Sequence, residues 1–185
     1  YNGFGTTCNG STDGTITMAI EGGNGGYTIT WVGPNGFTSS NADITGLQSG
    51  TYTATVTDMN GCTVQQVIEI TAPDPITPTL NSSLFPGGTQ ISCATAHDGS
   101  IETVTTGGAQ PFTYDWTGPD GYSSTNAMIT GLGPGTYCVS ITDANGCMAQ
   151  QCATLQAPAS LQLSTQASAS ACASDNGSID LTVVG

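Results

Sequence analysis

The chain of 185 residues contains no Lys and no Arg, although it carries 13 Asp and Glu residues and one His. Without basic side chains the protein cannot neutralise a phosphate backbone, so nucleic acid is excluded as a partner. An anionic membrane surface is excluded for the same reason. The carboxylates also have no Lys or Arg with which to form salt bridges. Stability must therefore come from core packing, backbone hydrogen bonds and covalent links.

The chain is a tandem array. Residues 8–73 recur at 93–158, shifted by 85 positions without a gap, and 30 of the 66 aligned positions are identical. A third, partial copy begins at Cys172. Repetition of this kind is typical of units copied for length or valency. The predicted domains are a first repeat (1–73, without its first strand), a second repeat (74–158) and the beginning of a third repeat (159–185).

Several kinds of functional site are missing. No apolar run is long enough to cross a bilayer, so we expect no insertion into a membrane. No Cys or His cluster has the spacing of a zinc site. The single histidine, His97, is replaced by Thr12 in the first repeat and has no nucleophile in a shared motif. We therefore predict no cofactor, no metal ion and no catalytic residues, and hence a protein that is not an enzyme.

Seven cysteines in a chain rich in Gly, Ser and Thr indicate an oxidising compartment, outside the cell or on its surface. Cys8 and Cys62 are separated by 54 positions, and so are Cys93 and Cys147. Because the spacing is the same in both copies, we predict that each pair forms a disulfide within its own domain.

Each repeat shows short alternating runs separated by turn residues, which is the pattern of a small β-sandwich. The predicted fold class is all-β, with tandem Ig-like or fibronectin-like β-sandwich domains. Proline-containing linkers are expected at 71–76 and 156–160. In the second repeat the predicted strands are 76–80, 90–93, 99–106, 111–117, 127–131, 135–142 and 147–155.

The hairpin between the last two strands of a repeat can be placed in register. Asp143-Ala-Asn-Gly-Cys147 suits a three-residue loop in which Gly takes the left-handed conformation. If Asp143 faces Cys147, then Cys138 lies opposite Cys152. We therefore predict an outward-facing disulfide between Cys138 and Cys152.

The same register in the first repeat sets Tyr52 against Ile68 on the inner face. It leaves an outward row of Thr51, Thr53, Thr55 and Thr57, which could carry O-linked glycans or simply reflect strand propensity. Three sequons could carry N-linked glycans in an extracellular chain, at Asn9, Asn81 and Asn176.

Two sets of residues could form binding sites, but each has a simpler structural interpretation. Trp31 and Trp116 could be exposed platforms for sugar rings, yet one Trp at the same point of a mid-domain strand is more typical of a core. Oxygen ligands for calcium are a second possibility, but the Asp-x-Asn-Gly stretch lacks the further acidic ligands of an EF-hand loop. Turn formation is therefore the prediction for Asp13, Asp58, Asn60, Asp98, Asp143 and Asn145.

The order of the shared motifs resembles that of the SprB-type repeats of large surface adhesins of gliding and related bacteria. These motifs are a Cys, Asp-Gly-Ser/Thr-Ile, Gly-Gly followed by a Trp, Ile-Thr-Gly-Leu-x-x-Gly-Thr-Tyr and Thr-Asp-x-Asn-Gly-Cys. The resemblance covers nearly the whole chain. It implies an extracellular, multi-repeat Ig-like protein that serves as a cell-surface filament or adhesin and is exported by a dedicated secretion system. It implies no catalytic residues.

Three functions remain open at this point. The first is a structural or adhesive filament whose partners are copies of the chain or further repeats, together with glycans or surfaces. The second is a repeated carbohydrate-binding module, which an exposed aromatic pair in each repeat would favour. The third is a secreted enzyme whose catalytic domain lies elsewhere.

The ends of the chain suggest how a filament could form. The first repeat has no counterpart of residues 76–85, and Cys172 has no obvious partner. We expect either continuation into further repeats or completion of a domain by a strand from a neighbouring subunit.

Overall fold

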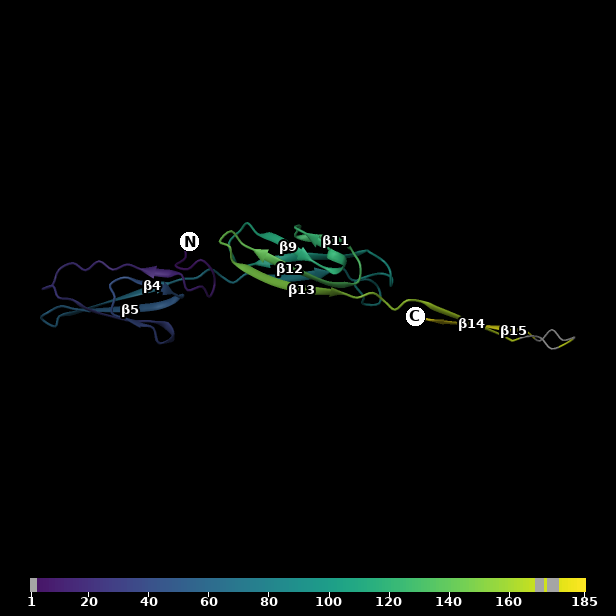
Figure 1. Cartoon of the computed structure of the whole chain (residues 1–185), viewed down its shortest axis with the longest axis horizontal. Helices are drawn as coiled ribbons and strands as arrows, with labels where there is room; N and C mark the ends of the chain where they lie inside the picture. The colour runs from purple at the N-terminus through teal and green to yellow at the C-terminus, as the bar shows by residue number, and fades with distance from the viewer. Residues whose placement is uncertain (1–2, 169–171, 173–176) are drawn as a thin grey trace. The chain divides into compact units, whose positions relative to one another are not determined.

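The computed structural model describes residues 3–168, 172 and 177–185, and in this part of the chain the regular structure consists of strands with two short 3-10 turns (Figure 1). None of the described helices has the length and apolarity needed to cross a membrane. The predicted all-β fold class is confirmed. Asn176, one of the three sequon residues, lies outside the described residues.

The first repeat forms two antiparallel sheets. A four-stranded sheet has the order β3-β2-β5-β6, and a two-stranded sheet pairs β1 with β4. The 3-10 turn η1 (Pro34–Gly36) joins β2 to β3. The strands are β1 (Gly14–Ile16), β2 (Thr28–Val32), β3 (Thr38–Ser39), β4 (Ile44–Leu47), β5 (Gly50–Thr57) and β6 (Thr63–Ile70).

The core of the first repeat lies between these two sheets. Strand β5 alternates in burial, because successive side chains of a strand point to opposite faces. Its inward residues meet Trp31 of β2 and the apolar residues of β4. The buried cluster consists of Ile16, Trp31, Ile44, Leu47, Tyr52, Ala54 and Ile70.

The second repeat has the same plan with one strand more. Its four-stranded sheet has the order β10-β9-β12-β13, and its other sheet has the order β11-β8-β7. The turn η2 (Pro119–Gly121) takes the place of η1. The strands are β7 (Thr77–Ser82), β8 (Gly99–Thr106), β9 (Thr113–Thr117), β10 (Ser123–Ser124), β11 (Met128–Leu132), β12 (Gly135–Thr142) and β13 (Met148–Leu155).

The predicted hairpin register is confirmed in the first repeat. Tyr52 faces Ile68, and Gly50 faces Ile70. The loop glycines Gly61 and Gly146 both have a φ of 83°, the left-handed conformation that the sequence predicts. Of the outward row, Thr51 is exposed and the other three threonines are half-buried.

One predicted strand is wrong, and one observed strand was not predicted. Residues 90–93 form no strand, because Gln90 and Ile91 both donate their backbone N–H to one carbonyl, that of Gln156, and do not run along a ladder. The short strand β10 was not predicted, since two residues carry too little alternation to be recognised.

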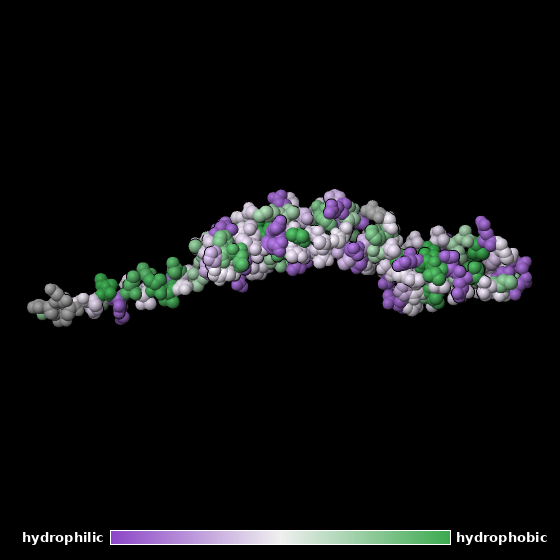
Figure 2. Space-filling model, turned by 180° about the vertical axis from the view of Figure 1, so that it is seen from behind, coloured by the Kyte–Doolittle hydropathy of each residue, from purple (hydrophilic) through white to green (hydrophobic). Residues whose placement is uncertain are grey.

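In the third repeat, β14 (Gln162–Ser168) pairs with β15 (Ser178–Val184) in a two-stranded antiparallel ladder. Every described side chain of both strands is exposed. Figure 2 shows hydrophobic residues gathered along this ladder. The large exposed ones on these strands or directly before them are Leu161, Leu163, Ile179, Leu181, Val183 and Val184.

Contacts divide the chain into two compact units. One comprises 1–78, 105–113 and 140–149, and the other comprises 79–104, 114–139 and 150–185. The hairpin tip that carries Cys147 thus belongs to the same unit as the first repeat. The repeat boundaries at 73 and 158 remain a prediction from sequence.

Candidate assembly and disulfide sites

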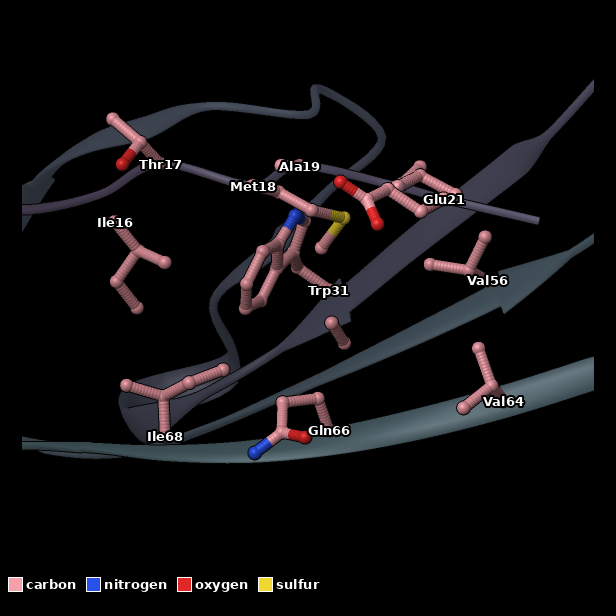
Figure 3. A pocket seen from close by; sticks show the side chains of 12 residues that line it. Ile16, Thr17, Met18, Ala19, Glu21, Trp31, Val56, Val64, Gln66 and Ile68 are labelled. Carbon is pink, nitrogen blue, oxygen red and sulfur yellow. The ribbon is translucent and has the colours of Figure 1, made fainter.

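An apolar groove of about 380 Å³ lies open on the first repeat. One wall is the segment 16–21, and the floor and opposite wall come from β2, β5 and β6 (Figure 3). Met18 lies beside the indole of Trp31 in this view. Other apolar side chains of the groove are Ile16, Ile20, Ala54, Val56, Val64 and Ile68.

The equivalent place in the second repeat has a strand beside it. Strand β7 pairs with β8 there, and its Pro78 and Leu80 are half-buried. In the first repeat Val64 is 63% exposed, whereas its counterpart Ala149 is half-buried. Among the described residues of the first repeat, no strand takes the place of β7. The groove therefore lies where β7 lies in the second repeat.

The backbone beside the groove also lacks a partner strand. Strand β1 ends at Ile16, and residues 17–21 belong to no strand, whereas their counterparts 102–106 are part of β8. A backbone left outside a ladder presents N–H and C=O groups to which another strand can add. The groove thus offers an apolar floor together with an unpaired edge.

The cysteine pairing differs from the prediction. Cys8 bonds Cys147, which lies 139 positions away, with a Cα–Cα distance of 5.6 Å. Asn145 and the sulfur of Cys147 both approach the carbonyl of Thr7, at 3.4 Å each. The predicted pairs Cys8–Cys62 and Cys93–Cys147 are wrong, because Cys8 and Cys147 bond each other and Cys62 and Cys93 are free.

Domain geometry explains this correction. Gly5 and Thr6 donate to the carbonyl of Thr71, so the segment before Cys8 is anchored at the C-terminal end of β6. Cys62 directly precedes β6, and eight residues of strand span roughly 26 Å. A disulfide requires Cα atoms within about 7 Å. The two cysteines of one repeat therefore lie at opposite ends of its last strand and cannot meet.

Apart from Cys8 and Cys147, the chain has one further disulfide and three free cysteines. Cys138 bonds Cys152 across β12 and β13, with Cα atoms 4.0 Å apart, as the hairpin register predicts. Cys62, Cys93 and Cys172 are free and exposed.

The aspartates of the hairpin loops accept backbone hydrogen bonds. The carboxylate of Asp58 accepts from the N–H of Cys62 and of Asn60, both at 2.9 Å. The N–H of Cys62 is the largest influence on the pKa of Asp58, and together with the other backbone donors it lowers that pKa. Burial raises the pKa of Asp143, but donors led by the N–H of Ala109 outweigh it, so that this pKa is also lowered.

The other predicted turn aspartates behave in the same way. Asp13 accepts from the backbone and hydroxyl of Thr7, and its pKa is lowered chiefly by that hydroxyl. Asp98 accepts from the N–H of Ser92, and the pKa of its carboxyl is lowered as well. Within the described residues, no three His, Cys, Asp or Glu side chains gather where they could hold a metal ion. The aspartates therefore organise turns, as predicted.

Both tryptophans belong to the cores. Trp31 and Trp116 are each 0% exposed, and their indole N–H groups donate to the carbonyls of Asn41 and Asn126 at 2.9 and 3.0 Å. A buried indole cannot stack on a sugar ring. Phe4 and Tyr27 are exposed in the first repeat, but their counterparts in the second repeat are Thr89 and the half-buried Phe112, so an exposed aromatic pair does not recur among the described residues.

The described sequon residues and His97 lie at the surface. Asn9 is exposed, although its amide donates to the carbonyl of Pro73 at 3.2 Å. Asn81 is exposed on β7, and His97 is exposed in the loop before β8. Glycosylation at Asn9 and Asn81 remains a prediction.

Comparison with known proteins supports the resemblance found in the motifs. The SprB repeat family matches residues 6–36 and 89–121, one segment in each of the first two repeats. No curated protein matches the chain. Among solved structures, the amphioxus IgVJ-C2 molecule is similar over 78% of this chain and 97% of its own, with 14% identity and a TM-score of 0.36.

The SprB match, which covers one segment in each of the first two repeats, is consistent with a cell-surface, adhesin-like repeat protein. SprB repeats and Ig-like folds are typically structural domains without enzymatic activity. Two disulfides are consistent with an extracellular location.

Proposed function

We propose that this chain is a structural and adhesive subunit of an extracellular or cell-surface filament built from Ig-like repeats. The observation that carries the proposal is the open groove of the first repeat, together with the strand β7 at the same place in the second. Strand β7 directly follows the linker that leaves the first repeat. A strand that leaves one repeat thus completes the next.

Besides the pairing of β7 with β8, the linker before β7 also contacts the second repeat. Gly108 donates its N–H to the carbonyl of Asp74 at 3.0 Å. A Cβ on Gly107 would lie 2.0 Å from the carbonyl oxygen of Pro75, so only glycine permits this approach. The first repeat has Gly22 and Gly23 at the equivalent positions, and a Cβ on Gly22 would meet nothing. Among the described residues, no segment approaches Gly22 as Pro75 approaches Gly107.

The occupant that fits the groove is strand β14 of a second copy. A shift of 85 positions carries Thr77, the first residue of β7, onto Gln162, the first residue of β14. Leu161, directly before β14, and Leu163 within it are 80% and 67% exposed and would be buried in the groove. Strand β14 would exchange its partner β15 for residues 17–21. A two-stranded ladder is marginal by itself, so burial of the leucines favours this exchange.

Sedimentation velocity tests the proposal. We expect the mass of the particle to grow with protein concentration for the wild-type chain and equally for Cys62→Ser/Cys93→Ser/Cys172→Ser, because strand exchange needs no disulfide between copies. The double substitution Leu161→Asp/Leu163→Asp should keep the chain monomeric, since it places two carboxylates in an apolar groove. The matched change Gln162→Asp/Ser164→Asp on the other face should leave most of the assembly. A wild-type chain that stays monomeric at every concentration would refute the proposal.

A further inference from the structure

We infer that Cys93 of one copy forms a disulfide with Cys62 of a second copy, so that the chain links head to tail. This inference deepens the filament proposal and rests on it. It begins from the bond between Cys8 and Cys147. Cys93 is the repeat counterpart of Cys8, and Cys62 is the repeat counterpart of Cys147. The free thiols of Cys93 and Cys62 therefore occupy the same positions in their repeats as the two bonded cysteines, Cys8 and Cys147, occupy in theirs.

The loop around Cys93 is built like the loop around Cys8. The carbonyl of Cys8 accepts the N–H of Ser11 at 3.1 Å, and the carbonyl of Cys93 accepts the N–H of Ala96 at 3.0 Å. In each loop the N–H of the preceding residue donates to an aspartate, Asp13 or Asp98, at 3.2 and 3.1 Å. Cys93 is thus held as Cys8 is, although it has no partner.

The hairpin that carries Cys62 also matches the one that carries Cys147. The N–H of each cysteine donates to the aspartate four positions earlier, at 2.9 Å in both copies. The N–H of that aspartate donates back to the cysteine carbonyl at 3.0 Å in both copies. The loop of Cys93 and the hairpin of Cys62 are therefore preorganised, which lowers the entropy lost when the disulfide forms.

Each of the two loop cysteines lies close to the start of the linker that leaves its own repeat. Cys8 follows a segment anchored at Thr71, where the linker of the first repeat begins. Cys93 follows a segment anchored at Gln156, where the next linker begins. If β14 of one copy enters the groove of another, its linker brings Cys93 toward the hairpin of Cys62. The bond would lock a contact that the strand makes first.

Formation of this bond requires an oxidant, for which a small-molecule disulfide such as oxidised glutathione is sufficient. The thiolate of Cys62 attacks the disulfide and releases one glutathione thiolate. The thiolate of Cys93 then attacks the mixed disulfide and releases the second. The two cysteine thiols lose two protons and two electrons in total, and both glutathione molecules leave reduced.

The test uses the full chain with Cys172→Ser, so that Cys62 and Cys93 are the only free thiols. We expect a glutathione redox buffer to produce a ladder of covalent oligomers on a non-reducing gel, and reduction to collapse it. Enzymatic cleavage after Asp and Glu should yield peptide 59–69 linked to peptide 70–98, because the bond between Asp74 and Pro75 resists such proteases.

Two matched variants make the test specific. With Cys62→Ser or Cys93→Ser added, either chain alone should run as a monomer on the non-reducing gel, and an equal mixture should give a covalent dimer and no larger band. Dimers of a single variant as abundant as those of the mixture would show random collision of exposed thiols and overturn the inference. A Cys172→Ser chain that gives no ladder, or linked peptides from other cysteines, would also overturn it. If sedimentation shows assembly but no ladder forms, this inference fails and the filament proposal stands.

Discussion

The double substitution Cys8→Ser/Cys147→Ser should lower the free energy of unfolding by up to about 5 kcal/mol. The bond between these cysteines spans 139 positions, and closing a loop of that size removes entropy from the unfolded chain by this amount in the chain-entropy model. Denaturant unfolding followed by tryptophan fluorescence measures the loss, since each of the first two repeats has one Trp.

A matched control uses the counterparts of the same two cysteines. Cys62→Ser/Cys93→Ser changes equivalent loop and hairpin positions that are free and exposed. This variant should unfold like the wild type when both are kept as monomers. Equal losses in the two variants would show that the Cys8–Cys147 bond does not link the first repeat to the hairpin of the second.

Replacement of Trp116 by Ala should destabilise the second repeat by about 3–5 kcal/mol, the usual effect of removing a buried aromatic side chain. Trp116 is 0% exposed, and its indole N–H donates to the carbonyl of Asn126. Its loss therefore leaves both a cavity and an unpaired carbonyl. Trp31→Ala should act in the same way on the first repeat, and thermal unfolding by circular dichroism measures both.

Tyr27→Ala provides the control for the tryptophans, because Tyr27 is 37% exposed. It should cost far less than either core substitution. A Trp116→Ala protein with unchanged stability would contradict the assignment of the indole to the core and would revive the sugar-platform interpretation.

The sequence predicts features that depend on local alternation and turn chemistry. The pairing of Tyr52 with Ile68 follows because a slip of one position would turn every inward side chain outward. The left-handed Gly61 follows from the three-residue loop. The bond between Cys138 and Cys152 follows from the same register. These predictions need no knowledge of distant contacts.

Features that depend on neighbouring repeats could not be predicted in the same way. In a tandem array, Cys8 and Cys62 have the spacing of Cys93 and Cys147 whichever cysteines bond, so equal spacing says nothing about pairing. The length of the last strand could have excluded the intradomain bond. The shortening of β1 to three residues was not predictable from alternation, because β8 is long where it pairs with β7, and among the described residues β1 pairs only with β4.

Electron microscopy of a capped chain tests most directly whether an added strand joins the subunits. Residues 76–85, fused directly in front of Tyr1, restore the spacing of the second repeat and supply the groove with its own strand. The wild-type chain should form fibres, and the capped chain should remain as single particles. A capped chain that forms fibres as readily as the wild type, or a wild-type chain that forms none, would contradict the account.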